Sequence, residues 1–177
     1  MPTHVHLVPI DAEFERALDG EPGTFLLRYR ADPGEAVSIV RDVVRRTLSL
    51  PPPRPPWGAY MAFDELGRMA VGTCGFKGMP DAAGSVEIAY STFSAFEGRG
   101  YATSMAARLL EIAWGASGVD SVVAHTKPEL NASTRVLEKL GFARGGEVVE
   151  SEDGTVWRWA RARPGRFRGT PSIPVPA

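Results

Sequence analysis

The stretch Glu97-Gly98-Arg99-Gly100-Tyr101-Ala102 separates a strand-like run from a long helical pattern in this 177-residue chain. Gly98 and Gly100 have no Cβ, so their backbone can approach a bulky anion closely. The helical pattern begins at Gly100, and the first four N–H groups of a helix have no intrahelical partner. These donors lie at the positive end of the helix dipole. The sequence therefore predicts a diphosphate site at the start of this helix.

Two other phosphate-binding motifs do not fit this segment. A Walker A loop needs Gly-Lys-Ser/Thr after its glycines, and Tyr101-Ala102-Thr103 stands there instead. A Rossmann motif needs three spaced glycines and a ribose-binding acid about 20 residues further on, whereas this loop has two glycines. A nucleotide hydrolase is therefore excluded. A tight strand-to-helix turn without a ligand remains the structural alternative.

Outward from this segment, the chain alternates between strand and helix patterns. Strands are expected at residues 5–10, 57–63, 69–76, 85–92, 121–126, 147–151 and 155–160. Helices are expected from the Asp11 cap to Gly20, from the Asp32-Pro33-Gly34-Glu35 start signal through Leu48, and over residues 100–118 and 131–140. A proline-rich loop at 50–56, a hairpin at 64–67 and a turn at 153–154 are predicted between them.

Composition limits the classes of protein that the chain can represent. Its 44% hydrophobic and 23% charged residues are typical of one globular domain. The net charge of −1 argues against nucleic-acid binding, which needs an excess of Lys and Arg. No run reaches the roughly 18 apolar residues of a membrane span, and the first residues lack an export pattern. With Cys74 as the one cysteine, a cytoplasmic protein without a disulfide or a metal site is expected.

The glycine loop resembles the acetyl-CoA signature of the GNAT acetyltransferases, Gln/Arg-x-x-Gly-x-Gly/Ala, with Glu97 where the family has Gln or Arg. Residues 131–142, which end in Leu140-Gly141-Phe142, resemble the last conserved helix of that family. Together with Trp57, 76–78 and 86–88, these motifs are most similar to the branch of ribosomal-protein N-terminal acetyltransferases. The resemblance covers most of the segment from Trp57 to Phe142.

The resemblance implies a fold and an activity. The fold is a single α/β (α+β) domain over residues 1–163, with a mixed, mostly antiparallel sheet of six to seven strands and about four helices. Residues 164–177 then form an irregular proline-rich tail. The activity is transfer of an acetyl group from acetyl-CoA to a primary amine by direct attack, in a monomer or homodimer without nucleic acid or membrane as partner. A catalytically weak acyl-CoA-binding module is the alternative.

The acceptor implied is a peptide N-terminus or a small amine. An α-amino group has an ordinary pKa of about 7.7–8.0, against about 10.4 for lysine, so more of it is neutral at physiological pH. The proline-rich loop at 50–57 and the hairpin near residue 153 are the expected acceptor contacts.

The resemblance also assigns cofactor contacts. The strand end is expected to pair its backbone with the pantetheine arm as an added strand would. Asn131 contacts CoA or caps the helix that follows it. The full cofactor set is Tyr90, Ser91, Thr92, Glu97, Gly98, Arg99, Gly100, Tyr101, Ala102 and Asn131.

Three residues are candidates for the chemistry. Glu87 lies near where related enzymes place a glutamate base, and an exposed strand glutamate is its alternative. The tyrosine that the family uses as the acid is Leu137 here, so Ser133, Tyr90 or water is expected to replace it. His125 ends a strand near the expected thioester and is either catalytic or structural. No metal ligand set is expected.

Overall fold

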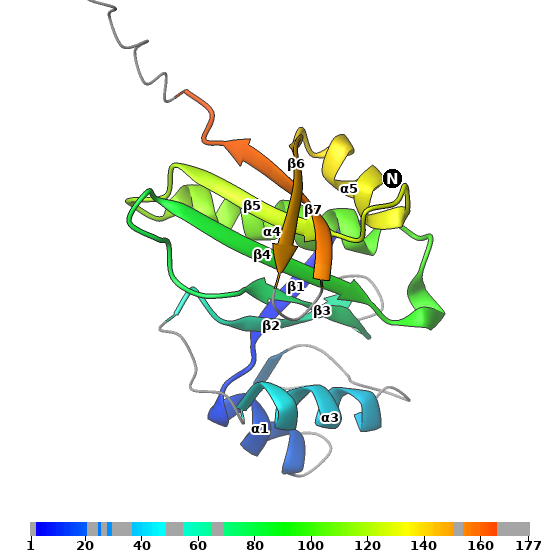
Figure 1. Ribbon diagram of the computed structural model, residues 1–177. Helices are drawn as coiled ribbons and strands as arrows, with labels where there is room; N and C mark the ends of the chain where they lie inside the picture. Colours follow the sequence, from blue (N-terminus) through cyan, green and yellow to red (C-terminus); the bar gives the residue numbers. More distant parts are fainter. Residues whose placement is uncertain are drawn as a thin grey trace, which may run out of the picture.

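The computed structural model describes residues 3–20, 25, 28–29, 37–48, 55–64, 69–150 and 154–165. Within them, seven strands form one sheet in the order β1-β2-β3-β4-β5-β7-β6 (Figure 1). The strands are β1 (Val5–Pro9), β2 (Ala59–Asp64), β3 (Ala70–Phe76), β4 (Ser85–Thr92), β5 (Ser121–Thr126), β6 (Ala143–Glu150) and β7 (Gly154–Ala162). β4 and β5 pair in parallel, and the other neighbours pair antiparallel. The predicted mixed, mostly antiparallel sheet is confirmed.

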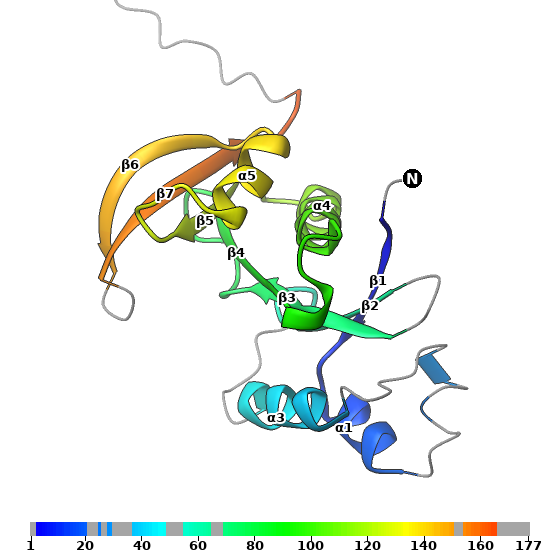
Figure 2. The same cartoon turned by 90° about the vertical axis from the view of Figure 1, so that its right-hand side faces the viewer.

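Helices cover both faces of the sheet. They are α1 (Ala12–Asp19), α3 (Val37–Leu48), α4 (Tyr101–Gly115) and α5 (Ala132–Lys139) among the described residues. Figure 2 shows α1 and α3 on one side of β2 and β3, with α4 on the other side. Side chains alternate along β2 to match: Met61 and Phe63 join the core beneath α1 and α3, whereas Tyr60 and Ala62 join the core that contains α4.

The predicted start of α1 and the predicted apolar face of α3 are both seen in the described residues. The Asp11 carboxylate accepts hydrogen bonds from the N–H groups of Glu13 and Phe14 at 2.9 and 2.8 Å, so it caps α1 as predicted. In α3, the predicted apolar face is confirmed by Val40 and Val44, which are buried. The start signal at 32–35 lies outside the described residues.

β4 and β5 have the predicted bounds, whereas several boundaries predicted for other elements were wrong, some of them by two to four residues. The strand expected from Trp57 begins at Ala59, because Trp57 packs into the core ahead of it. The strand expected from Glu147 begins four residues earlier, at Ala143. The helix expected to reach Gly118 ends at Gly115.

An arginine distant in the sequence explains the end of α4. The Arg163 guanidinium donates to the carbonyl oxygens of Trp114, Ala116 and Val119 at 2.8, 2.6 and 2.7 Å. It therefore satisfies carbonyl groups that the end of the helix leaves unpaired. A cation at this end also favours the negative pole of the helix dipole.

Parts of the predicted loops lie outside the described residues: 50–54 of the proline-rich loop, 65–67 of the hairpin and residue 153 of the turn. Among the described helices, none has the length and apolar character that crossing a bilayer requires.

Candidate active site

A cavity of about 690 Å³ opens between the end of β4, the glycine loop and α5. Most of the predicted cofactor residues line it: Tyr90, Ser91, Thr92, Glu97, Gly98, Gly100, Tyr101 and Ala102. Ser133, predicted for catalysis, lines the same cavity. Residues separated by more than 40 positions in the sequence thus surround one space.

The wall of this cavity includes the beginning of α4. Gly100 is the N-cap residue and has the left-handed conformation, with φ +87° and ψ 0°. The first main-chain bond of the helix runs from Ser104 N–H to the Gly100 carbonyl at 3.1 Å. The N–H groups of the helix that come before Ser104 have no side-chain cap: Gly100 makes no capping hydrogen bond, and the first turn contains no acidic residue. The helix entrance can therefore receive an anion from the cavity.

Arg99 and Asn131, two of the predicted cofactor residues, have structural contacts beside the cavity. The Arg99 guanidinium lies 5.6 Å from the centre of the Phe96 ring, and the Arg99 carbonyl accepts a hydrogen bond from the Thr3 hydroxyl at 2.8 Å. The Asn131 side chain accepts from Thr134 N–H at 3.1 Å and caps α5. Neither residue is among the described residues that line the cavity.

β4 and β5 separate beside the cavity (Figure 1). Their parallel pairing joins Ser85 to Ser121, Val86 to Val122 and Glu87 to Val123, yet both strands continue beyond this point. The facing edge of β4 after Glu87 is therefore open to another extended chain, as in strand addition. The side chain of Tyr90 crosses toward α5, where its hydroxyl donates to the Ser133 carbonyl at 3.3 Å.

One buried hydroxyl in this region has no partner. Thr92 Oγ1 is shielded from solvent and makes no hydrogen bond in the described structure, although Thr92 lines the cavity. Buried polar atoms are nearly always paired, and an exception calls for an explanation.

A second cavity, of about 290 Å³, holds Glu87 and His125. Glu87 Oε1 lies 2.7 Å from Lys77 Nζ and 3.0 Å from His125 Nδ1. The His125 Nε2 atom lies 3.7 Å from Glu150 Oε1. The His125 side chain is 11% exposed and the Glu87 side chain 24%, so their contact is largely shielded from water. Glu87 is thus a half-buried member of a charge cluster rather than an exposed strand residue.

Opposing effects act on the Glu87 carboxyl. Burial by itself would raise its pKa, but the hydrogen bonds and positive charges of Lys77 and His125 outweigh burial and lower the pKa. Glu87 is therefore ionised at neutral pH and can accept a proton or orient a donor. For Tyr90, burial raises the pKa, which keeps its hydroxyl protonated.

The two cavities share Tyr90 and Ser133. Together they can hold a long ligand whose anionic end lies at the helix entrance and whose other end reaches the Glu87 carboxylate. This arrangement brings together all of the predicted catalytic residues, Glu87, Ser133 and His125.

Several residues beside the cavities were not predicted. Arg135 and Lys139 line the larger cavity from α5. Their i, i+4 spacing on a predicted helix is the sequence signal that could have placed them on one cationic face. Lys77 joins Glu87 because its N–H donates to the Glu87 carbonyl at 3.0 Å, next to the pairing of Phe76 with Ile88. That contact depends on strand register, which the sequence alone does not give.

Known proteins resemble this chain in sequence and in fold. The chain is 35% identical over 80 residues to the uncharacterized N-acetyltransferase YjdG of Bacillus subtilis. That match covers 45% of this chain and 48% of YjdG, so the chain spans about half the length of this relative.

Two solved structures illustrate the shared fold. The ribosomal L7/L12 α-N-protein acetyltransferase RimL, in complex with coenzyme A, superposes on this chain with a TM-score of 0.61 at 15% identity. The superposition covers 90% of this chain and 94% of the RimL chain. The spermidine/spermine N-acetyltransferase SpeG of Vibrio cholerae superposes with a TM-score of 0.58 at 13% identity, covering 90% and 92%. At these identities the likeness establishes the fold alone.

The family model for the acetyltransferase (GNAT) domain matches residues 9–143. This match extends from the end of β1 to the beginning of β6, and so includes the glycine loop, the separated strands and α5. The chain therefore belongs to the GNAT acetyltransferase family.

Proposed function

We propose that the protein transfers the acetyl group of acetyl-CoA to a primary amine by direct attack of the amine on the thioester. The observation that carries this proposal is the junction at Tyr90 and Ser133, where the cavity at the helix entrance meets the cavity that holds Glu87. A ligand that is anionic at one end and reactive at the other fits this combined space, with its anionic end at the helix entrance and its reactive end beside Glu87.

At the phosphate end, the backbone at Gly98 and Gly100 and the first N–H groups of α4 bind the diphosphate of CoA. The pantetheine arm lies along the open edge of β4 and pairs with its backbone as an added strand. In this position the arm brings polar groups close to Thr92, whose buried hydroxyl has no partner in the described structure. Backbone contacts dominate this scheme, so Glu97 in place of Gln or Arg is compatible with binding.

At the reactive end, the amine reaches the thioester beside Glu87. The Glu87 carboxylate takes the proton of the amine, directly or through a water, while the new C–N bond forms. The tetrahedral intermediate then breaks its C–S bond and releases the CoA thiolate. The hydroxyls of Ser133 and Tyr90 donate hydrogen bonds to this thiolate until it takes a proton from water.

A turnover assay tests this proposal. Incubation with acetyl-CoA and a panel of amines and short peptides is expected to release free CoA and to increase the mass of one acceptor by an acetyl group. Without an amine, the intact mass of the protein is expected to stay unchanged, because direct attack forms no acetyl-enzyme. Tight binding of acetyl-CoA with no turnover on any acceptor would instead indicate an acyl-CoA-binding module.

The cationic face of α5 gives a second test. Exchange of Arg135 and Lys139 for glutamate is expected to weaken CoA binding by about tenfold, because each exposed charge contact contributes on the order of 0.2–1 kcal/mol. Calorimetry at two salt concentrations measures this effect, which should shrink at high salt. Arg108, which pairs with Glu111 on α4, supplies the control Arg108→Glu, which is compared with Arg135→Glu and with Lys139→Glu one at a time. An equal loss of affinity in the control would show a general effect of charge instead.

A further inference from the structure

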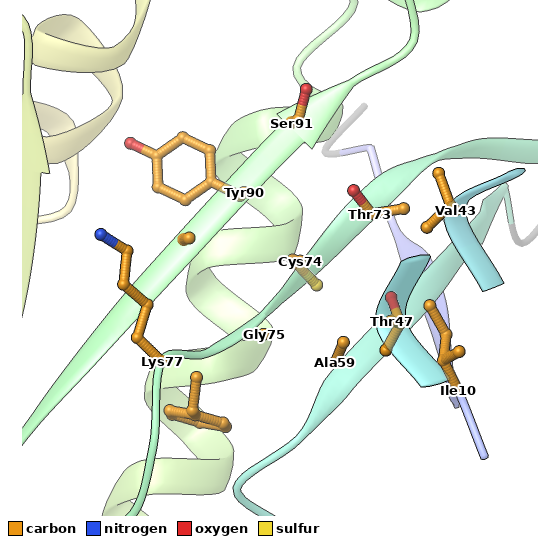
Figure 3. Close-up of a pocket in the computed structure, with 12 residues that line it drawn as sticks. Ile10, Val43, Thr47, Ala59, Thr73, Cys74, Gly75, Lys77, Tyr90 and Ser91 are labelled. Atoms are coloured by element: carbon orange, nitrogen blue, oxygen red, sulfur yellow. The ribbon is translucent and has the colours of Figure 1, made fainter. Parts of the chain in front are cut away.

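A third cavity, of about 280 Å³, lies between α3 and the strands β3 and β4. In Figure 3, Ile10, Val43 and Thr47 line one side, whereas Lys77 and Tyr90 lie on the other side with their polar ends directed away from these residues. Half of its lining residues have apolar side chains: Ile10, Val43, Ala59, Cys74, Phe76 and Ala89. We refer to this space as the apolar cavity.

The apolar cavity adjoins the candidate active site. It shares Lys77, Ala89 and Tyr90 with the cavity of Glu87, and it shares Tyr90 and Ser91 with the larger cavity. Tyr90 thus lines all three spaces. An amine held next to the Glu87 carboxylate can direct its substituent into the apolar cavity, into a polar cavity of about 280 Å³ that Glu87, Asp81 and Arg158 line, or out into solvent.

The charges of the apolar cavity distinguish between possible substituents. Its described lining residues include no carboxylate, and their one cation, Lys77, forms an ion pair with Glu87 outside the cavity. The thiol of Cys74 stays neutral, since burial raises its pKa to about 12. A second ammonium group placed there would lose water without gaining a counter-ion, which is costly. An apolar group would lose nothing comparable and would gain from burial.

We propose that the acceptor is a primary amine whose substituent is a single apolar group, held in the apolar cavity. This inference rests on the proposed function, because it assigns the acceptor side of the same reaction. The cavity is just below the range of about 300–1,000 Å³ typical of small-molecule sites, so it accommodates one side chain rather than a whole ligand. An amino-terminal residue with an aliphatic side chain and a free aliphatic monoamine share this chemistry.

A substrate panel tests the proposal. Peptides that differ only in their first residue, Leu, Ala or Lys, are compared by kcat/KM with 3-methylbutylamine, 1,5-diaminopentane and spermidine. Among the peptides and among the free amines, the apolar acceptor is expected to have a kcat/KM at least about tenfold above that of its cationic counterpart. This is the discrimination that one small group can give. The ratio between the Leu peptide and 3-methylbutylamine then tells whether a peptide or a free amine is the natural source.

Two variants of Val43 test whether the apolar cavity makes this choice. Val43→Asp places a carboxylate in the cavity and is expected to shift the ratio of kcat/KM toward 1,5-diaminopentane by at least about tenfold. Val43→Phe fills the cavity and is expected to shift preference from the Leu to the Ala peptide. Ile39→Asp is the matched control, because Ile39 lies on the same helix, is 47% exposed and is not among the cavity's described residues. Ratios measured on one variant are independent of the fraction that folds.

The outcomes separate this inference from the proposed function. If the wild-type protein acetylates spermidine or the Lys peptide best, the apolar acceptor is wrong, whereas the acetyltransferase proposal stands. The same conclusion follows if Val43→Asp and Ile39→Asp change the ratio equally. Acetyl-CoA binding without turnover on any member of the panel would overturn both.

Discussion

Glu87→Gln is expected to lower kcat by about 10²–10⁴-fold, the usual contribution of a positioned general base, with unchanged affinity for acetyl-CoA. Glutamine keeps the shape of the side chain and can still accept a hydrogen bond from Lys77 or His125, but it cannot take a proton from the amine. The measurements are steady-state kinetics and calorimetry with CoA. Glu111→Gln is the matched control, because Glu111 is 60% exposed on α4 and pairs with Arg108. Full activity in Glu87→Gln would remove this carboxylate from the mechanism.

The pH dependence sharpens this test. In the proposed mechanism the ionised form of Glu87 is the active one, and its pKa lies below the ordinary 4.5, so protonation of Glu87 itself lowers activity only as the pH falls through that low value. Lys77→Met removes one hydrogen bond and one positive charge while burial continues to raise the pKa. The acid limb of kcat/KM is therefore expected to move to higher pH in Lys77→Met.

Profiles recorded from about pH 3 to pH 8, with activity checked after return to neutrality, measure this shift. The return to neutral pH separates titration of the site from acid unfolding. An acid limb in Lys77→Met that coincides with the wild-type limb would contradict the assignment of Glu87 as the titrating base.

The parts of the fold that the sequence predicted best are those with strong local signals. β4 and β5 have the expected bounds, since each is a β-branched run between turn residues. β6 begins earlier than the sequence predicted. The prediction missed its first residues, Ala143-Arg144-Gly145-Gly146, because they have low strand propensity. They form a strand through pairing with β7, across a register shift between Arg144 and Gly146. Tertiary pairing overrides local propensity there.

The site shows the same division between local and distant information. The glycine loop was found from sequence because helix-start chemistry is local and Gly98 and Gly100 are adjacent to it. Glu87 and His125 were each predicted, whereas their contact across 38 positions depends on the parallel pairing of β4 with β5. The apolar cavity was not predicted at all, because α3 and β3 meet only through the tertiary fold.

Gly100→Val is expected to weaken acetyl-CoA binding by between about fivefold and 150-fold. Gly100 has φ +87°, a conformation that a β-branched residue adopts only under strain of roughly 1–3 kcal/mol. A Cβ there would also lie 3.3 Å from the hydroxyl oxygen of Thr3, which donates to Arg99. In the variant, the loop is expected to relax into another conformation, and acetyl-CoA must restore the binding geometry at the expense of its affinity. Each 1.4 kcal/mol of strain that binding restores raises the Kd about tenfold.

The opposite end of α4 provides the control for this strain. Gly118 has φ +84°, and no atom lies within 4 Å of the position of its Cβ, so Gly118→Val imposes similar backbone strain far from the cavity. Both variants are expected to lower the midpoint of thermal unfolding, whereas Gly100→Val alone is expected to lose affinity for acetyl-CoA in calorimetry. If the two variants bind acetyl-CoA equally well, then the amides at the entrance of α4 do not hold the diphosphate, and the binding site must lie elsewhere.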